Sequence, residues 1–390
     1  MVRDLELARL IYSDALAGIR ETPNIVLLLD LSLAAIEFER AIGEDFSARD
    51  HFFEALDLLS GFRGVEPWLF GGVAQVGWTA FQLSRYTGVQ LKGLDRFDGM
   101  ILDWITGFPD EHDVDLPSGL LGLGVYALSH PEPAVREKMT AQIITVVENR
   151  AERDEHGLFV RLAPYEARMR TRPEVVGHRD LGVAHGSAGL VSFLASVAMS
   201  GLPSAQRGAE LLSSTLGWLM HQRRPLEGTV YPHSVESRYE PSRSAWCYGD
   251  PGVAMAMAVA ARATGSAEIA AEARVVARAA ITRPPERARV LDACLCHGAA
   301  GLVWFGCMAG AEWNLPETAD FIHHWSGYIH QQRADGPLHY LVRGGFHRDH
   351  SFLEGDLGVA LALLTLSTGR PPIWGERMLG SAVLPPERRP

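Results

Sequence analysis

The sequence predicts an all-α protein, an α/α toroid in which helices alternate between an inner and an outer layer around a common axis. Three observations indicate this double-layered helical barrel. A Gly-x-x-Gly motif followed by an aliphatic stretch recurs along the chain, amphipathic stretches lie between its copies, and strand-like alternation is scarce. We expect six to seven helical hairpins in a single domain over residues 1–390, with short β-containing loop insertions.

The inner helices are predicted from the glycine motif, which occurs in five intact copies and one degenerate copy. Successive copies begin 48, 67, 63, 49 and 57 residues apart. The degenerate copy is the first, GGVAQVGWTAF from Gly71, with Ala74 in place of the second glycine. The intact copies are GLLGLGVYAL from Gly119, GSAGLVSFLA from Gly186, GDPGVAMAMA from Gly249, GAAGLVWFGC from Gly298 and GDLGVALALL from Gly355. Their small residues would let helices converge closely on one axis, and glycine also permits the unusual backbone at the entry to a helix.

The outer helices are predicted from three stretches between the copies. These are Pro133–Glu148, Ala205–Leu219 and Ala267–Ala280, whose apolar residues recur near the 3.6-residue helical period. Residues 1–65 carry at least two more helical stretches and are expected to supply a further hairpin. Because inner helices this apolar would be poorly covered in an open solenoid, a closed ring is favoured.

Composition and charge exclude several classes of protein. The chain has 390 residues, 47% of them hydrophobic, and a net charge of −11, which is typical of a folded protein and disfavours a nucleic-acid partner. The longest apolar run, Val253–Ala261, is too short for membrane insertion, and the N-terminus lacks the pattern of a secretory signal. We therefore expect a cytoplasmic protein.

Alignment of the units on the first glycine of each motif brings reactive side chains into register. The residues before this glycine should lie at the N-terminal ends of the inner helices, on one rim of the ring. Cysteines stand two positions before Gly249 and Gly298, and histidines stand one position before Gly186 and Gly298. The polar side chains gathered on this rim are Asp115, His185, Arg243, Cys247, Tyr248, Cys296, His297 and Glu354. The register predicts one functional site.

Cys247, Cys296 and His297 are predicted to bind one zinc ion. Two thiolates and an imidazole suit Zn²⁺, and three protein ligands leave a fourth tetrahedral position for water or substrate, as in catalytic sites. Helix N-termini beneath the cysteines favour the thiolate form. A fourth thiolate from Cys294 would close the site, but we expect Cys294 to face the helix packing and Cys307 to lie in the core.

His185 is the predicted proton-transfer residue. It stands between small residues in GVAHGSAG, where no packing contact requires an imidazole. Asp115 in the neighbouring unit would bind one ring nitrogen and fix the tautomer, leaving the other nitrogen for proton transfer. On local grounds Asp115 serves equally well as a helix cap, and Asp113 is an alternative because it is close by.

Other polar residues support weaker predictions. Taken alone, Arg243 reads as half of a surface ion pair and Tyr248 as a packing residue, while Glu354 is a rim carboxylate without an obvious partner. Five further histidines are predicted on an outer helix (the first three) or in a charged loop (the last two): His323, His324, His330, His347 and His350.

Two long charged loops, 151–181 and 222–245, are expected to flank the mouth of the ring and contact substrate. Short β-prone stretches such as GLFVRLAPYEARMR favour a small insertion near the mouth at residues 151–181.

Three motifs together resemble those of a known family. They are AHGSAG from Ala184, WCYGDPG from Trp246 and LCHGAAG from Leu295. In this order and spacing they resemble the lanthionine synthetase C family, the cyclases of class I lanthipeptide biosynthesis, over about Trp68–Leu364. The resemblance implies an α/α toroid with a single zinc ion and a set of site residues. The implied zinc ligands are Cys247, Cys296 and His297, and the implied catalytic residues are His185, Asp115, Arg243 and Tyr248.

The resemblance also implies an activity. A cysteine thiol of a dehydrated precursor peptide would add to dehydroalanine or dehydrobutyrine and form a (methyl)lanthionine ring, with a lanthipeptide dehydratase and an exporter as further partners. One alternative is a relative that adds glutathione or another external thiol to dehydrated peptides. Lower-ranked alternatives are a noncatalytic zinc scaffold and a carbohydrate enzyme that uses the rim carboxylates Asp115 and Glu354.

Overall fold

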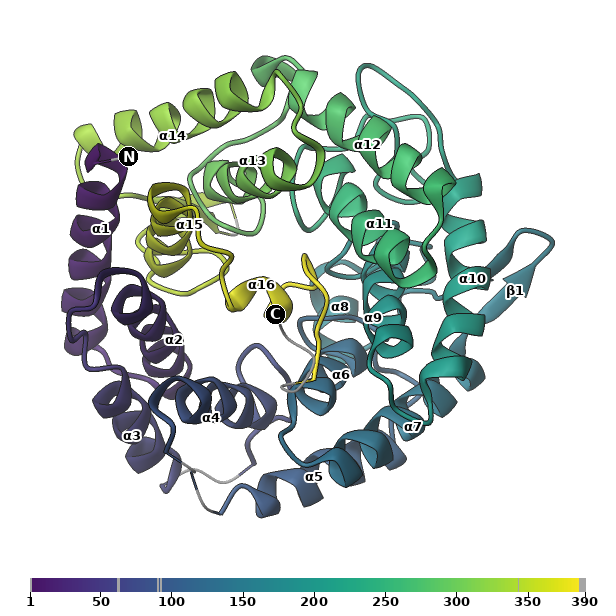
Figure 1. The fold of residues 1–390 in the computed structure, drawn as a ribbon, viewed down its shortest axis with the longest axis horizontal. Helices are drawn as coiled ribbons and strands as arrows, with labels where there is room; N and C mark the ends of the chain where they lie inside the picture. The colour runs from purple at the N-terminus through teal and green to yellow at the C-terminus, as the bar shows by residue number, and fades with distance from the viewer. Residues whose placement is uncertain (1, 62–63, 90, 92, 343, 386–390) are drawn as a thin grey trace.

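The fold is a ring of helices in two concentric layers (Figure 1). It was obtained as a computed structural model that describes residues 2–61, 64–89, 91, 93–342 and 344–385. Within these residues seven inner helices alternate with seven outer ones, which confirms the predicted α/α toroid and its number of hairpins.

The inner layer consists of α2 (Ile25–Ile42), α4 (Val73–Thr87), α6 (Leu120–Ser129), α9 (Ser187–Met199), α11 (Asp250–Thr264), α13 (Ala299–Trp313) and α15 (Asp356–Thr368). The outer layer consists of α1 (Val2–Glu21), α3 (Ala48–Leu59), α5 (Asp95–Thr106), α7 (Pro133–Arg150), α10 (Ala205–His221), α12 (Ala267–Thr282) and α14 (Thr318–Ala334). Every residue of α6 is buried, whereas α10 buries only one face, as expected for inner and outer positions.

Glycine occupies the position directly before six of the inner helices. These glycines are Gly72, Gly119, Gly186, Gly249, Gly298 and Gly355. For the five intact motifs this is the predicted start. The degenerate copy was placed one residue too early, because α4 begins at Val73 and its glycine is Gly72, not Gly71.

The glycines let the loop before each inner helix lie directly on the first turn of that helix. Gly249 has a φ of 119°, and a Cβ on Gly252 would overlap the carbonyl oxygen of Trp246. The loop carbonyls in turn accept hydrogen bonds from the free amides of the helix start, as Asp292 does from Ala299 at 3.0 Å. Close loop-to-helix packing therefore accounts for most glycines in these places. The unusual backbone expected at the entry to a helix is present at Gly249, and the expected close approach of inner helices is present at Gly124, where a Cβ would overlap the ring of Phe193 in α9.

A run of backbone hydrogen bonds joins the rim loops of five consecutive units. The amide of Cys296 donates to Leu353 at 2.9 Å, and that of Cys247 donates to Cys296 at 3.3 Å. The amide of Ala184 donates to Cys247 at 3.4 Å, and that of Leu116 donates to Ala184 at 3.0 Å. The register inferred from the sequence is thus present as a continuous hydrogen-bonded rim.

Helix α1 closes the ring by covering the last inner helix, α15 (Figure 1). It is also tied to the neighbouring outer helix α14, where His330 lies 2.9 Å from Asp4 and Arg333 donates to Asp14 at 2.8 Å. Residues 1–65 therefore supply the predicted hairpin, α2 with α3, and also the outer partner of the final unit.

The C-terminal segment lies inside the ring (Figure 1). It includes the short helix α16 (Trp374–Arg377), whose Arg377 forms a 2.8 Å ion pair with Asp30 of α2. Ser192 of α9 donates to the carbonyl of Leu379 at 2.7 Å, and the amide of Val383 donates to Ser196 at 3.0 Å. This segment thus connects opposite inner helices through the centre.

Two small β-hairpins interrupt the helical pattern. One pairs β1 (Glu152–Asp154) with β2 (Gly157–Phe159), and the other pairs β3 (Tyr340–Val342) with β4 (Gly345–His347). The β-prone stretch of the first insertion is only partly a strand, because its second half forms helix α8 (Glu166–Thr171), which is followed by a 3₁₀ turn. His347 ends a strand instead of lying in a loop.

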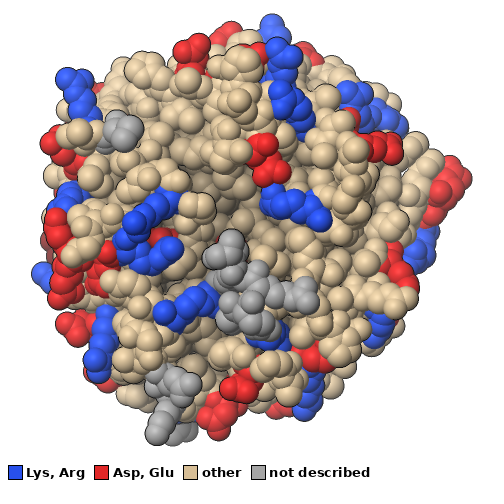
Figure 2. Space-filling view, viewed as in Figure 1, with Lys and Arg blue, Asp and Glu red and all other residues tan. Residues whose placement is uncertain are grey.

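The described helices include none that is both long enough and apolar enough to span a bilayer. On the face of the ring in Figure 2, basic and acidic side chains are interspersed around the edge.

Candidate active site

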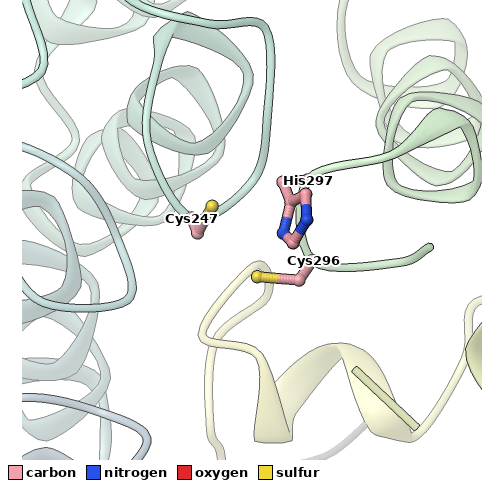
Figure 3. Close-up of side chains that lie close together, drawn as sticks. All are labelled: Cys247, Cys296 and His297. Carbon is pink, nitrogen blue, oxygen red and sulfur yellow. The ribbon is translucent and has the colours of Figure 1, made fainter. Parts of the chain in front are cut away.

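Cys247, Cys296 and His297 come together at the rim, with one potential ligand atom of each lying within 4.8 Å of the others. Figure 3 shows the three side chains converging from two neighbouring loops. One loop precedes α11 and the other precedes α13, and the hydrogen bond from the Cys247 amide to the Cys296 carbonyl fixes their spacing. Two adjacent repeats therefore build one cluster.

The cluster fits a zinc ion. Ligand atoms about 2.3 Å from a tetrahedral zinc lie about 3.8 Å from each other, which the observed spacing accommodates with small side-chain movements. A hydrogen bond from Cys296, assisted by His297, lowers the pKa of Cys247 well below its usual value, and the same contact raises the pKa of Cys296. The contact therefore favours the deprotonated form of Cys247 over that of Cys296.

Cys294 lies beside this cluster, but its side chain has different contacts. It is fully buried, its sulfur accepts a hydrogen bond from the amide of His297 at 3.5 Å, and burial raises the pKa of its thiol. Its sulfur also groups with Asp292 and His297 within 4.8 Å, so His297 is shared by two sets of potential ligands. Cys307 lies in α13 as predicted, although it is only half-buried.

His185 pairs with Asp115 on the same rim. The Nδ1 atom of His185 lies 2.6 Å from Asp115 Oδ2, and the other carboxylate oxygen accepts the amide of Ser118 at 3.1 Å. The histidine side chain is 28% exposed and the aspartate only 1%. The partner of His185 is therefore Asp115, and Nε2 is the ring nitrogen left for a reacting group.

Asp113 has a separate task. It accepts the amide of Ala163 at 2.6 Å and forms a 2.5 Å ion pair with Arg168 of α8. This buried contact holds the 151–181 segment against the loop that carries Asp115.

Tyr248 connects the two histidines of this region. Its hydroxyl donates to Asp180 at 2.8 Å, and its ring stacks at 3.8 Å between centroids on His233 and at 5.9 Å on His185. Burial lowers the pKa of His233 to about 4, with Arg172 and Arg243 adding to the shift, so this ring is neutral near pH 7.

Arg243 is exposed at the edge of a pocket of about 750 Å³ that reaches His297. The pocket is bordered by residues of both the 151–181 and the 222–245 segments. Glu354 is also exposed on the rim.

Sequence reasoning missed Asp180 and His233. Asp180 had a signal that the alignment could have shown: aspartate stands six positions before the motif glycine in four units, at Asp113, Asp180, Asp292 and Asp349. In the unit of Cys247 this position is Arg243. His233 had no such signal, because it comes from a loop that does not repeat. Among the other histidines, His323, His324 and His330 lie on outer helix α14 as predicted.

Comparison with known proteins gives the family. A profile of lanthionine synthetase C-like proteins matches residues 44–376. Among solved structures, nisin cyclase has a TM-score of 0.76 with 18% sequence identity, over 96% of this chain and 98% of that chain. An inactive variant of an alpha-1,6-mannanase from Salegentibacter sp. HEL1_6 covers 92% of this chain and 89% of its own at 11% identity, but its TM-score of 0.42 supports no inference. Because the profile spans most of the toroid and both loops of the cysteine–histidine cluster, the chain belongs to the lanthionine synthetase C-like family.

Proposed function

We propose that this chain is a zinc-dependent lanthipeptide cyclase with one zinc ion in a single domain. The reaction is the intramolecular addition of a cysteine thiol to dehydroalanine or dehydrobutyrine in a dehydrated precursor peptide. The observation that carries the proposal is the meeting, on one rim, of a three-ligand cluster and the hydrogen-bonded pair of His185 and Asp115. Family membership agrees with it.

The zinc ion would be held by Cys247, Cys296 and His297, and when bound it would lower the pKa of a substrate thiol presented at its open position. A free thiol with a pKa near 8.5 is only a few per cent thiolate at pH 7. Complete deprotonation therefore accelerates attack by roughly thirtyfold. The remaining acceleration must come from the residues that position the peptide and manage its charge.

In the addition, the sulfur forms a bond to the β-carbon, and the electrons of the C=C bond move toward the neighbouring amide, giving an enolate. The exposed guanidinium of Arg243 is suited to stabilise the negative charge on the amide oxygen. His185 then delivers a proton from Nε2 to the α-carbon, oriented by Asp115 on Nδ1. Tyr248 packs beside the imidazole of His185, and the hydrogen bond from its hydroxyl to Asp180 fixes the position of the tyrosine ring.

The proposal is tested by incubating the zinc-loaded protein with a dehydrated, cysteine-containing peptide and then alkylating the free thiols. Ring closure leaves the peptide mass unchanged and removes an alkylation site, which mass spectrometry detects. If every cysteine stays alkylatable, the proposed reaction is wrong. A mass increase equal to an added external thiol such as glutathione would instead identify a thiol-transfer relative.

A noncatalytic scaffold is distinguished by the variant Cys247→Ala. A cyclase should lose turnover with this change, whereas a scaffold would show none in either form. A carbohydrate enzyme is disfavoured because Asp115 is buried and held by His185 and Ser118, and so is unavailable as a rim acid.

The proposed cyclase function also implies a cellular location and partner proteins. We propose a cytoplasmic location, with the precursor peptide supplied by a lanthipeptide dehydratase and the product removed by an exporter.

A further inference from the structure

The pocket beside His297 is lined by three arginines, Arg172, Arg243 and Arg289. They come from three separate segments: the turn after α8, the 222–245 loop and the loop before α13. Two of these segments are joined by hydrogen bonds, since the amide of Ser244 donates to the carbonyl of Ala288 at 2.9 Å. The arginines therefore surround one space and are not scattered over the surface.

These arginines are poorly neutralised by the protein. Among the described residues, the guanidinium groups of Arg243 and Arg289 have neither an ion pair nor a hydrogen bond, and Arg172 has only a 3.9 Å contact with the exposed Glu174. Of the two acids that line the pocket, Glu236 is bound to an arginine outside it at 2.9 Å. Among the described residues that line the pocket, Glu240 is thus the one acid left to balance three positive charges, besides the exposed Glu174 near Arg172.

This local excess is notable in a chain whose net charge is −11. The field of the arginines already acts on a neighbouring group, because Arg172 and Arg243 contribute to the lowered pKa of His233. Arg289 also has a φ of 58°, in the left-handed region that residues with a side chain adopt rarely. Strained residues of this kind concentrate at sites of function.

We infer that this pocket binds a carboxylate of the peptide substrate, with Arg172 and Arg289 as the residues that select it. Guanidinium groups match carboxylates in shape and charge, and these two arginines line the same pocket from different loops. The pocket also has apolar lining, including Leu291, whose side chain is 59% exposed, to accept neighbouring side chains. This inference rests on the proposed function, since it concerns the substrate of the same site.

The carboxylate has two possible sources, an acidic side chain near the reacting cysteine or the C-terminus of the peptide. Binding is measured with short fluorescent peptides in which serine replaces the cysteine, so that no reaction occurs. One series has glutamate or glutamine directly before or after this position, and the other has a free or an amidated C-terminus. Tighter binding of the acidic member in one series identifies the source.

The arginines are tested by Arg172→Gln and Arg289→Gln, with Arg287→Gln as the matched control. Arg287 is exposed in the same loop as Arg289 but lies outside the pocket. Each pocket variant should weaken binding of the acidic peptide by about fivefold at low salt, with no such change in the control. The preference of wild-type protein for the acidic peptide should also fall with added salt.

A charge exchange separates specificity from misfolding. Arg289→Glu should disfavour the glutamate peptide and prefer the same peptide with lysine, a reversal that a damaged fold would not produce. Equal binding of acidic and neutral peptides by the wild-type protein would overturn the inference. Because these peptides cannot react, that result leaves the cyclase function standing, and failure of ring closure leaves the binding result standing.

Discussion

His185 is the residue whose protonation decides when the proposed reaction is fast. Burial opposes a charged ring, but the hydrogen bond and the charge of Asp115 outweigh it, so the pKa of His185 is raised above its usual value. A raised pKa keeps the imidazolium present to higher pH, which suits a group that must deliver a proton. The same contact makes the imidazolium a weaker acid. The pairing with Asp115 therefore increases the protonated fraction of His185 and lowers its tendency to donate the proton.

The pH dependence of the rate of ring closure should reflect the pKa of His185 and its shift by Asp115. With His185 as the acid, the rate of ring closure should fall as pH rises through its raised pKa. Asp115→Asn removes the charge that raises this pKa and should move the alkaline decline to lower pH. Initial rates from pH 5 to 9 test this. An unchanged decline in the variant would show that another group is responsible.

Removal of the imidazole should separate metal binding from catalysis. His185→Asn is expected to keep the zinc content of the wild type, because His185 lies outside the cysteine–histidine cluster. It should slow ring closure by about 10²–10⁴-fold, the usual contribution of a general acid. Zinc is measured by elemental analysis and turnover by thiol alkylation. Full activity would remove His185 from the mechanism.

The rim loops and the inner helices that follow them form the repeating element of the molecule. The second motif glycine has a specific task, since a Cβ on Gly301 would overlap the carbonyl oxygen of Leu295, next to Cys296. An alanine here must push the loop away from the helix. The packing of one backbone on another thereby sets the positions of Cys296 and His297.

Gly301→Ala should lower the free energy of unfolding by about 1–3 kcal/mol and weaken zinc binding. Gly327→Ala on the exposed face of α14 is the matched control, because nothing lies within 4 Å of its new Cβ. That change should stabilise the helix by about 0.5–1 kcal/mol. Urea unfolding and a competitive zinc chelator measure both effects. A neutral result at Gly301 would contradict the packing argument.

The part of this element that sequence could predict is the part that depends on local backbone chemistry. Motif glycines are needed where a loop lies directly on a helix start. Their positions in the sequence therefore identify Cys247 and His297 as residues of such loops without any knowledge of the fold. His233 could not be assigned a role, because its contact with Tyr248 arises only when a non-repeating loop folds over the rim. Asp180 stands at a repeated position, but no pattern in the sequence indicates that it accepts a hydrogen bond from Tyr248. The helix at Glu166–Thr171 was missed since a six-residue helix has almost no periodic pattern.

At the scale of the whole molecule, the C-terminal segment fills the centre of the ring and connects inner helices on opposite sides. Its Arg377 and Asp30 are 1% and 3% exposed, and Asp30 also accepts the amide of Phe352 at 3.1 Å. Phe352 belongs to the rim loop whose next carbonyl, that of Leu353, accepts the amide of Cys296. The segment is therefore connected to the cysteine–histidine cluster through a short series of hydrogen bonds. No local pattern in the sequence indicates this connection.

Arg377→Met should lower the free energy of unfolding by about 3–5 kcal/mol, because it leaves Asp30 as a buried charge without its counter-ion. Arg9→Met is the control. Arg9 also pairs with a carboxylate, that of Glu44, but the two side chains are 38% and 57% exposed, so the loss should be much smaller than at Arg377. Urea unfolding compares the two. Equal losses would show that the buried pair does not hold the segment in place.

Closure of the ring by α1 has a consequence for the order in which the protein can fold. Asp4 and His330, which meet where the first helix joins the last unit, are 326 positions apart in the chain. At 5–20 residues per second, a ribosome needs about 16–65 s to make the intervening polypeptide. During that time the first helix can pack on the neighbouring α2, as Tyr12 does on Phe38, but the part of its apolar face that covers α15 has no native partner. That part depends on chaperones or on transient contacts until the final helices emerge.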